Sequence, residues 1–451
     1  MPYYKRMLRI AVPTMIQNGV TNFVSMLDNI MVGQVGTLQM TGVSIVNQLL
    51  FVFNLCIFGA MSGAGIFTAQ FYGKKDNDGV KNTVQYKIIA ALIFTFLGVG
   101  VFLLLGDALI SAYIQEGSDP SEAALVAGYS KSYLQIMLWN TLPFAIAQAY
   151  ASSLRETKDR VVPMTATVVA VFVNLILNYI LIFGHFGAPK MGIEGAAIAT
   201  VIARFAECGI LVLWSHTHKK KYPFIKQLFT KTTITVQQIK KITLISVPLI
   251  INEALWAAGI AFLNQCYSMR GLSVVAAINI VSTLSNVFNV SFLSFGSSIG
   301  IILSQMLGAG KREEANKASM RMLWFAVFSV FLIAAVMACF SGIFPKIYKT
   351  DSYVHSLSTT LILIMAAYMP VQSFLNACYF SLRSGGKTLI TFIFDSGFVW
   401  SVAIPLAFCL SRFTDLPIIT LYTVIQSVDL IKCIIGYVFL KKGAWLNTVV
   451  E

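Results

Sequence analysis

Six polar side chains recur at steps of three and four along one otherwise apolar stretch near the start of the chain. They are Asn18, Thr21, Asn22, Ser25, Asp28 and Asn29. Residues spaced this way share one face of a helix, so the stretch predicts a polar stripe. The stripe fits the wall of a water-accessible cavity, and a hydrogen-bonded seam between helices explains its amides and hydroxyls equally well. For Asp28 we favour a functional role, because no Lys or Arg at helical spacing would neutralise it.

Other oxygen-bearing side chains could join Asp28. Asn174 and Asn178 are one helical turn apart, and Thr200 lies in the next apolar stretch. A carboxylate, two carboxamides and a hydroxyl form a set of oxygen ligands that suits a hard cation such as Na⁺. A carboxylate removed from water also favours its protonated form, so Asp28 could carry H⁺ instead. The sequence leaves both coupling ions open.

Acidic residues also occur inside apolar stretches of the second half. Glu253 follows Asn252, and Asp395 lies in a later stretch. A charged group costs about 2.5–3.5 kcal/mol in the middle of a membrane span, so we expect Glu253 to have a function, whereas Asp395 fits a functional or a structural role. A further stretch predicts a polar face that fits either a cavity lining or a packing seam: Asn279, Ser282, Asn286 and Asn289.

Two pairs of opposite charge stand three residues apart within single apolar stretches. They are Arg204 with Glu207, and Asp429 with Lys432. Neighbours at this spacing on one helix can neutralise each other. We therefore predict that each pair is structural, or that its basic member extends to the membrane interface.

The composition requires these residues to lie in a membrane. Of the 451 residues, 57% are apolar and only 12% are charged, against about 25% charged in soluble domains. A helix needs about 20 apolar residues to cross a bilayer, and twelve stretches qualify. We therefore predict an all-α membrane protein with spans near 10–34, 43–71, 88–113, 128–151, 161–184, 192–214, 242–267, 276–306, 320–344, 355–381, 388–411 and 416–440.

The distribution of charge predicts the topology. The 33 Lys and Arg residues against 19 Asp and Glu residues give a net charge of +14, and the basic residues concentrate in alternate loops. Because basic loops remain on the cytoplasmic side, the pattern predicts cytoplasmic termini and argues against a nucleic-acid partner. We expect a multi-pass protein of a bacterial plasma (inner) membrane.

The two halves of the chain repeat one another over residues 13–73 and 248–308. The matches include Pro13 with Pro248, Gly65 with Gly300, and Gln70-x-x-Gly73 with Gln305-x-x-Gly308. Each copy holds six spans, and an even number means that the two are inserted in parallel. The repeat predicts an N-lobe over 1–214, a basic cytoplasmic linker over 215–241 and a C-lobe over 242–451. Proline interrupts the hydrogen bonding of a helix, so Pro13 and Pro248 are expected to be hinges.

Several of these segments resemble the multidrug and toxic compound extrusion (MATE) family of transporters. They are Leu27–Gly33 followed by Gly36, Asn174–Gly184 followed by Pro189, Gly192–Thr200, and the two Gln-x-x-Gly segments. The resemblance extends over nearly the whole chain. It implies an exporter whose two six-helix lobes form a V around a central cavity that opens alternately to either side. Family members exchange drug-like, often cationic and aromatic compounds for H⁺ or Na⁺.

The resemblance also implies roles for individual residues. The family's first-span Asp falls on Asp28, its fifth-span polar pair on Asn174 and Asn178, its sixth-span Thr on Thr200 and its seventh-span Glu on Glu253. Some members have Asp where Asn178 stands, which leaves Asp28 as the only carboxylate of the proposed first-lobe site. Some have an acid in the tenth span where this chain has Gln372, so Asp395 is a candidate substitute in the C-lobe. We expect a monomer with no cofactor besides the coupling ion.

Three other functions fit the sequence less well. A lipid-linked oligosaccharide or polysaccharide flippase of the same superfamily would need a strongly cationic cavity, whereas these spans carry acids and amides. An ion channel usually has symmetry among subunits around one pore. A membrane enzyme would need convergent catalytic groups, and no Walker A, GxSxG or HExxH motif is present. The sequence favours an efflux antiporter over all three.

Overall fold

The computed structural model describes residues 3–114, 119–157, 159–226, 228–229, 234–348, 350–443 and 445–450. Throughout these ranges the regular structure is helical, with no strand. Residues 227 and 230–233 of the predicted linker lie outside the described residues.

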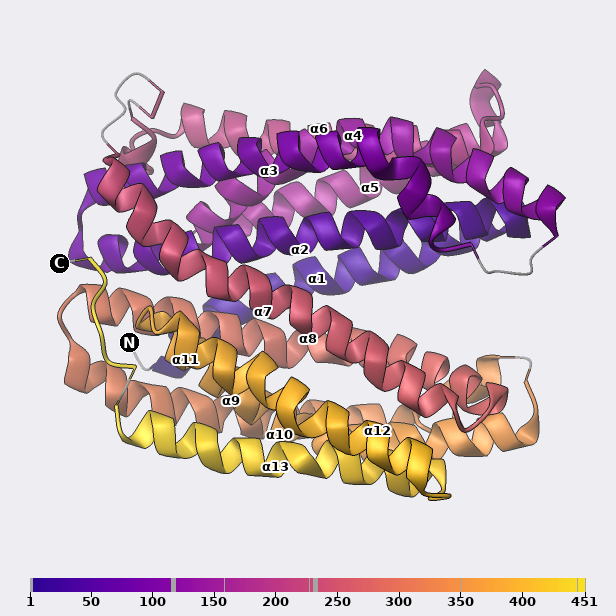
Figure 1. The fold of residues 1–451 in the computed structure, drawn as a ribbon. Coiled ribbons are helices and arrows are strands. Elements are labelled where there is room, and N and C mark those ends of the chain that lie inside the picture. Colours follow the sequence, from indigo (N-terminus) through magenta and orange to yellow (C-terminus); the bar gives the residue numbers. More distant parts are fainter. Residues whose placement is uncertain are drawn as a thin grey trace. The chain divides into compact units, whose positions relative to one another are not determined.

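Thirteen α-helical segments follow one another along the described chain (Figure 1). Their bounds are α1 Tyr3–Gly33, α2 Thr37–Lys74, α3 Asn77–Ser111, α4 Pro120–Glu156, α5 Val161–Phe183, α6 Gly192–Thr217, α7 Val236–Ser268, α8 Leu272–Gly308, α9 Arg312–Phe340, α10 Ser352–Ser384, α11 Thr388–Phe392, α12 Ile404–Phe413 and α13 Ile418–Lys441. Two π-helical segments, Ile393–Gly397 and Val399–Ala403, join α11 to α12. The span Thr388–Phe413 is therefore one continuous helix, and the described chain has twelve long helices.

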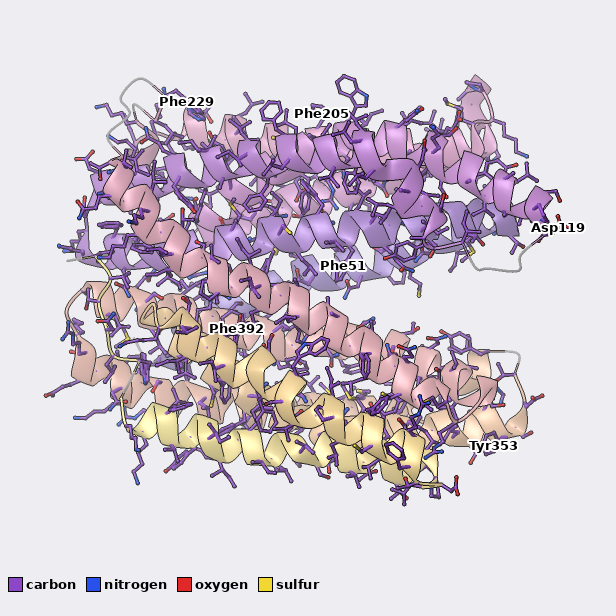
Figure 2. All side chains as sticks on the ribbon, viewed as in Figure 1. Phe51, Asp119, Phe205, Phe229, Tyr353 and Phe392 are labelled. Atoms are coloured by element: carbon purple, nitrogen blue, oxygen red, sulfur yellow. The ribbon has the colours of Figure 1, made fainter. Side chains whose placement is uncertain are left out.

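Ten of these helices are long and apolar enough to cross a membrane, among the residues described. The other two, α1 and α4, are long enough but more polar. Large apolar side chains stay exposed along the helices, among them Leu104 at 85% and Phe96 at 74%; Figure 2 labels two more, Phe51 and Phe205. Extensive exposed apolar surface requires a lipid partner. The predicted all-helical membrane fold with twelve spans is confirmed.

The chain forms two compact units. Unit 1 comprises Met1–Met15, Ala69–Asp76 and Leu244–Glu451, and unit 2 comprises Ile16–Thr68 and Asn77–Thr243. In unit 2, α4 packs against α3 and α6; in unit 1, α10 packs against α9 and α13. The fourth span of each unit thus contacts the third and sixth, as the parallel repeat requires. Helix α1 begins in unit 1 and continues in unit 2, and α2 begins in unit 2 and ends in unit 1.

The two repeated Gln-x-x-Gly segments contact each other within unit 1. A methyl group on Gly73 would overlap the backbone carbonyl of Gln305, and one on Gly308 would overlap that of Gln70. Glycine is needed at both places because only a residue without a Cβ atom allows two backbones to come this close. Gln70 also binds the segment after α13, because its Oε1 accepts from the backbone N–H of Val449 at 2.8 Å.

Candidate functional site

The predicted cation-coupling residues of the first half come together within unit 2. Asn178 Nδ2 donates to Asp28 Oδ1 at 2.8 Å and lies 3.2 Å from Asn174 Oδ1. Asn174 Nδ2 in turn lies 3.2 Å from Thr200 Oγ1, whose hydroxyl donates to the Ala196 carbonyl at 2.9 Å. Three helices, α1, α5 and α6, thus contribute to one polar cluster, which we call the Asp28 cluster (Asp28, Asn174, Asn178 and Thr200).

Local sequence places these residues. The buried positions of α5 include Ala166, Ala170, Asn174, Asn178 and Ile182, four residues apart, so both amides lie on its packed face. On α6, Gly195 lets the helix approach α5, since a Cβ there would lie 2.7 Å from the Leu181 carbonyl oxygen. This close approach brings the next turn and a half of α6, which carries Thr200, within reach of Asn174.

The Asn174 amide has two orientations with different consequences for Asp28. In the orientation described above, its oxygen faces the carboxylate oxygens of Asp28. In the opposite orientation its nitrogen donates to both, at 2.9 and 3.1 Å, and its oxygen lies 3.2 Å from Thr200 Oγ1. Two facing oxygens repel, so the second orientation, in which Asn174 donates to the carboxylate, is the one that satisfies both groups.

Asp28 is positioned as an unpaired acid. Among the described residues, the ion pairs of unit 2 engage other carboxylates, including Glu156 with Lys87 and Glu207 with Arg204. Asn178 is 1% exposed, and its Oδ1 is buried without a hydrogen-bond partner. A buried orphan oxygen beside a carboxylate is the donor type that a hard cation would bind, so the residues fit Na⁺ as well as H⁺.

The other predicted residues of α1 lie outside the Asp28 cluster. Thr21 donates to the carbonyl of Gln17 in its own helix at 2.9 Å. Asn18 and Asn22 are half-buried, whereas Ser25 and Asn29 are exposed. Asp28 is the member of the stripe that accepts a hydrogen bond from Asn178 of α5.

A second polar chain in unit 2 was not anticipated from the sequence. Gln17 Nε2 donates to Thr167 Oγ1 at 2.8 Å, and Thr167 Oγ1 donates to Glu207 Oε1 at 2.6 Å. Arg204 binds the other oxygen of Glu207 at 2.7 Å, which confirms the predicted Arg204–Glu207 pair. Gln17 precedes the polar stripe by one residue, and this adjacency was the only available signal.

Unit 1 holds the predicted acids of the second half. Glu253 Oε1 lies 3.5 Å from the Tyr379 hydroxyl, and Gln372 Nε2 donates to Asp429 Oδ2 at 2.6 Å. Asn279 and Asn286 have exposed side chains on α8. The structure therefore groups Glu253 with α10 and leaves Asn279 and Asn286 of α8 at the surface.

The predicted pairing of Lys432 with Asp429 is wrong. Lys432 Nζ binds Asp395 Oδ1 at 2.6 Å, and Asn252 Nδ2 donates to Asp395 Oδ2 at 3.1 Å. The long, flexible lysine side chain reaches across to the π-helical turn that carries Asp395, while Asp429 accepts one hydrogen bond from Gln372. Neither Asn252 nor Tyr379 was expected at this site, although Asn252 is next to Glu253 in sequence.

A loop outside the spans carries one further ionic cluster. Asp159, between α4 and α5, accepts hydrogen bonds from Lys221 and Tyr222 after α6. Partial burial acts to raise the pKa of Asp159, but the bonds from Lys221 and Tyr222 outweigh it and hold that pKa below its usual value. The same bond raises the pKa of Lys221. The cluster ties the start of the predicted linker to the α4–α5 turn.

Comparison with known proteins places this geometry in a family. A family model described as MatE matches residues 13–180 and 248–409. The probable multidrug resistance protein NorM of Thermotoga maritima is 24% identical over 449 residues, covering 98% of this chain and 93% of the relative. The probable multidrug resistance protein YoeA of Bacillus subtilis is 27% identical over 429 residues, covering 92% and 89%.

Solved structures agree on the fold. One, described as the outward-facing conformation of a multidrug resistance MATE family transporter of the MOP superfamily, matches with a TM-score of 0.87 at 17% identity over 98% of this chain and 96% of that one. The first segment of the family model contains Asp28, Asn174 and Asn178, and the second contains Glu253 and Asp395. The chain therefore belongs to the MATE family of transporters.

Proposed function

We propose that this protein is a secondary active multidrug efflux transporter that exchanges drug-like, often cationic and aromatic compounds for H⁺ or Na⁺. One observation carries the proposal: Asp28 contacts the amides of Asn174 and Asn178 and forms no ion pair among the described residues. A carboxylate inside a membrane span costs free energy, and such residues are typically found along ion or substrate pathways. The names of the relatives, probable multidrug resistance proteins, support the class of substrate.

Cation binding at Asp28 would change the hydrogen bonds of the whole cluster. A proton or Na⁺ on the carboxylate removes its negative charge, so Asn174 no longer needs to direct its nitrogen toward it. The amide can then rotate so that its oxygen faces the bound cation. Binding at Asp28 thereby rearranges contacts between α1 and α5, the two helices that carry the acid and the amides.

The rearrangement would reach the rest of the protein through α1. Pro13 lies inside this helix and deprives the carbonyl four residues earlier of its hydrogen bond. The boundary between the two units falls at Met15 and Ile16, two residues further along, which supports bending near Pro13. Pro248 in α7 stands close to the boundary at Leu244 and is proposed as the second hinge. Exchange requires only that cation and substrate favour different conformations.

The remaining parts of the proposal concern the cell and the assembly. We propose a monomer in a bacterial plasma membrane with both termini in the cytoplasm, and with lobes over 1–214 and 242–451 joined by the linker 215–241. Glu253, Gln372 and Asp395 are proposed to bind substrate or take part in coupling in the C-lobe, with Asn279 and Asn286 lining the substrate path. Asn18, Thr21, Asn22, Ser25 and Asn29 are proposed to line it from α1.

The experiment is transport by the purified chain in lipid vesicles. A pH gradient and a Na⁺ gradient are applied separately, and movement of a cationic dye and of a labelled lipid are followed in parallel. Dye movement against its own gradient under one of the two ion gradients is the expected result. Lipid movement without dye movement would replace the antiporter by a flippase.

A further inference from the structure

Unit 1 buries an ammonium group against a carboxylate. The side chain of Lys432 on α13 is 6% exposed, and its Nζ lies 2.6 Å from Asp395 Oδ1. The same nitrogen lies 5.2 Å from the centre of the Phe394 ring. A buried lysine is tolerated only where a counter-charge compensates it, and Asp395 supplies that charge.

Hydrogen bonds from neighbouring side chains fix the orientation of the Asp395 carboxylate. Its other oxygen accepts from Asn252 Nδ2 at 3.1 Å, and Asn252 is itself fixed by Ser396, whose hydroxyl donates to Asn252 Oδ1 at 2.8 Å. Asp395 and Ser396 both lie in the π-helical turn Ile393–Gly397, a type of distortion frequent at functional sites. The Asp395 side chain is 20% exposed, so a ligand can reach it while Lys432 stays buried.

A second carboxylate stands within reach of the same ammonium. Asp429 precedes Lys432 by three residues on α13, a spacing that makes their side chains neighbours on one helix face. Asp429 accepts one hydrogen bond from Gln372 Nε2 at 2.6 Å, which leaves its remaining lone pairs free to accept another donor. The four-carbon stem of a lysine is flexible, so Lys432 can serve either Asp395 or Asp429 by rotation of its side chain.

We propose that Lys432 is a tethered cation that competes with the cationic nitrogen of a transported compound for Asp395. This inference rests on the proposed export of cationic compounds and names the residue that sets their affinity. A monocationic ligand that binds Asp395 displaces the ammonium, which moves one helical turn to Asp429. Asp395, Asp429 and Lys432 together carry one net negative charge without the ligand and none when a monocationic ligand is bound. When Lys432 returns to Asp395, it displaces the ligand.

The competition can be measured as equilibrium binding of ethidium, a monocationic aromatic dye, to the purified full chain. Lys432→Met removes the competitor and is expected to lower the Kd at least tenfold. Asp429→Asn removes the alternative partner of the displaced ammonium and is expected to raise the Kd about fivefold. Lys432→Arg keeps the charge and is expected to stay within threefold of wild type.

Lys441→Met is the matched control, because it removes one positive charge from the exposed end of the same helix. Its Kd should equal that of wild type. A Lys432→Met variant that folds but binds ethidium no more tightly than wild type overturns the proposal, including the case in which neither binds. If Lys432→Met does not fold, Asp429→Asn decides alone, and an unchanged Kd in that variant overturns the proposal.

The same series separates this inference from the antiport function. If the Kd values follow the expected order but no ion gradient moves dye in vesicles, the antiporter assignment fails and the competition stands. If gradients move dye and the Kd values do not change, the antiporter stands and the role of Lys432 fails.

Discussion

Single side chains set the behaviour of Asp28. Its carboxylate accepts from Asn178 at 2.8 Å, and a hydrogen bond to a charged group contributes about 1.5–3 kcal/mol. The amides therefore hold the charged form in place without neutralising it. An arginine in the same position would bind the carboxylate permanently and remove its ability to exchange ions.

Loss of the Asn178 amide should impair transport more than folding. In Asn178→Leu, Asp28 loses one of its amide donors, and at about 1.4 kcal/mol per tenfold we expect at least a tenfold fall in gradient-driven dye export. Export is measured in vesicles at matched protein content. Tyr179→Leu, at the adjacent exposed position of α5, is the control. Equal export by both variants would mean that the amide has no part in coupling.

The residues of the Asp28 cluster were predictable from sequence, and the C-lobe pairing was not. Asn174 and Asn178 share a face through their spacing alone, and Thr200 was joined to them because it lies in the next apolar stretch; the family resemblance pointed to the same residues. The partner of Lys432, in contrast, depends on how α13 is rotated against the π-helical turn Ile393–Gly397 that follows α11. A π turn comes from packing between helices, and the local sequence carries no signal for it. The spacing of Asp429 and Lys432 could predict only a pair within one helix.

Among the helices, the close approach of the ends of α2 and α8 depends on two glycines. The internal repeat identified both glycines as equivalent positions. It could not predict that they contact each other, because equivalent positions in two copies need not be close in space. Helix α1 begins at Tyr3, whereas the apolar stretch was predicted from residue 10. A helix can extend beyond the hydrocarbon region of the membrane, so the apolar stretch did not predict where the helix starts.

Alanine at either glycine should destabilise the protein. Gly73→Ala and Gly308→Ala would each force two backbones apart, and overpacking of this kind costs about 1–3 kcal/mol. We expect a fall in the apparent Tm in detergent for both. Gly100→Ala serves as the control, because a Cβ there meets nothing within 4 Å and helix propensity favours alanine. A Tm for Gly73→Ala as high as that of Gly100→Ala would rule out the close approach.

The Asp159 cluster predicts how the linker responds to pH. The pKa of Asp159 is lowered in the folded protein. The charged Asp159 therefore stabilises the folded state at pH values above its pKa in the unfolded chain, about 3.9. This stabilisation is lost as the pH falls through the pKa of the folded protein. The pKa of Lys221 is raised in the folded protein. The charged Lys221 therefore stabilises the folded state at pH values below its pKa in the unfolded chain, about 10.4. This stabilisation is lost as the pH rises through the pKa of the folded protein. The anchor is thus complete at neutral pH.

Asp159→Asn should loosen the start of the linker by about 1 kcal/mol, a modest figure because the Lys221 side chain is exposed. At pH 7 we expect faster tryptic cleavage at Lys219–Lys221 than in wild type. The difference in Tm between the two proteins should shrink as pH falls below about 4. Asp78→Asn, which removes another exposed acid, should cleave at the wild-type rate. A wild-type cleavage rate in Asp159→Asn would contradict the anchoring role.

For the whole molecule, charge distribution predicts which loops face the cytoplasm. A protease site inserted after Lys220 should be cut only from the cytoplasmic side, in inside-out vesicles. One inserted after Phe186, an exposed residue in the loop between α5 and α6, should be cut only from outside. The reverse pattern would invert the topology and with it the direction assigned to transport.

At this scale the central claim is that occupancy of Asp28 decides the direction in which the transporter faces. The most direct test compares Asp28→Asn with wild type in vesicles under whichever gradient drives export, at equal amounts of folded protein, with Asp107→Asn as a control acid that lies exposed beside Lys131. The account predicts that Asp28→Asn still binds dye but loses gradient-driven export at least tenfold, whereas Asp107→Asn exports normally. Gradient-driven export by Asp28→Asn at the wild-type rate would contradict the account.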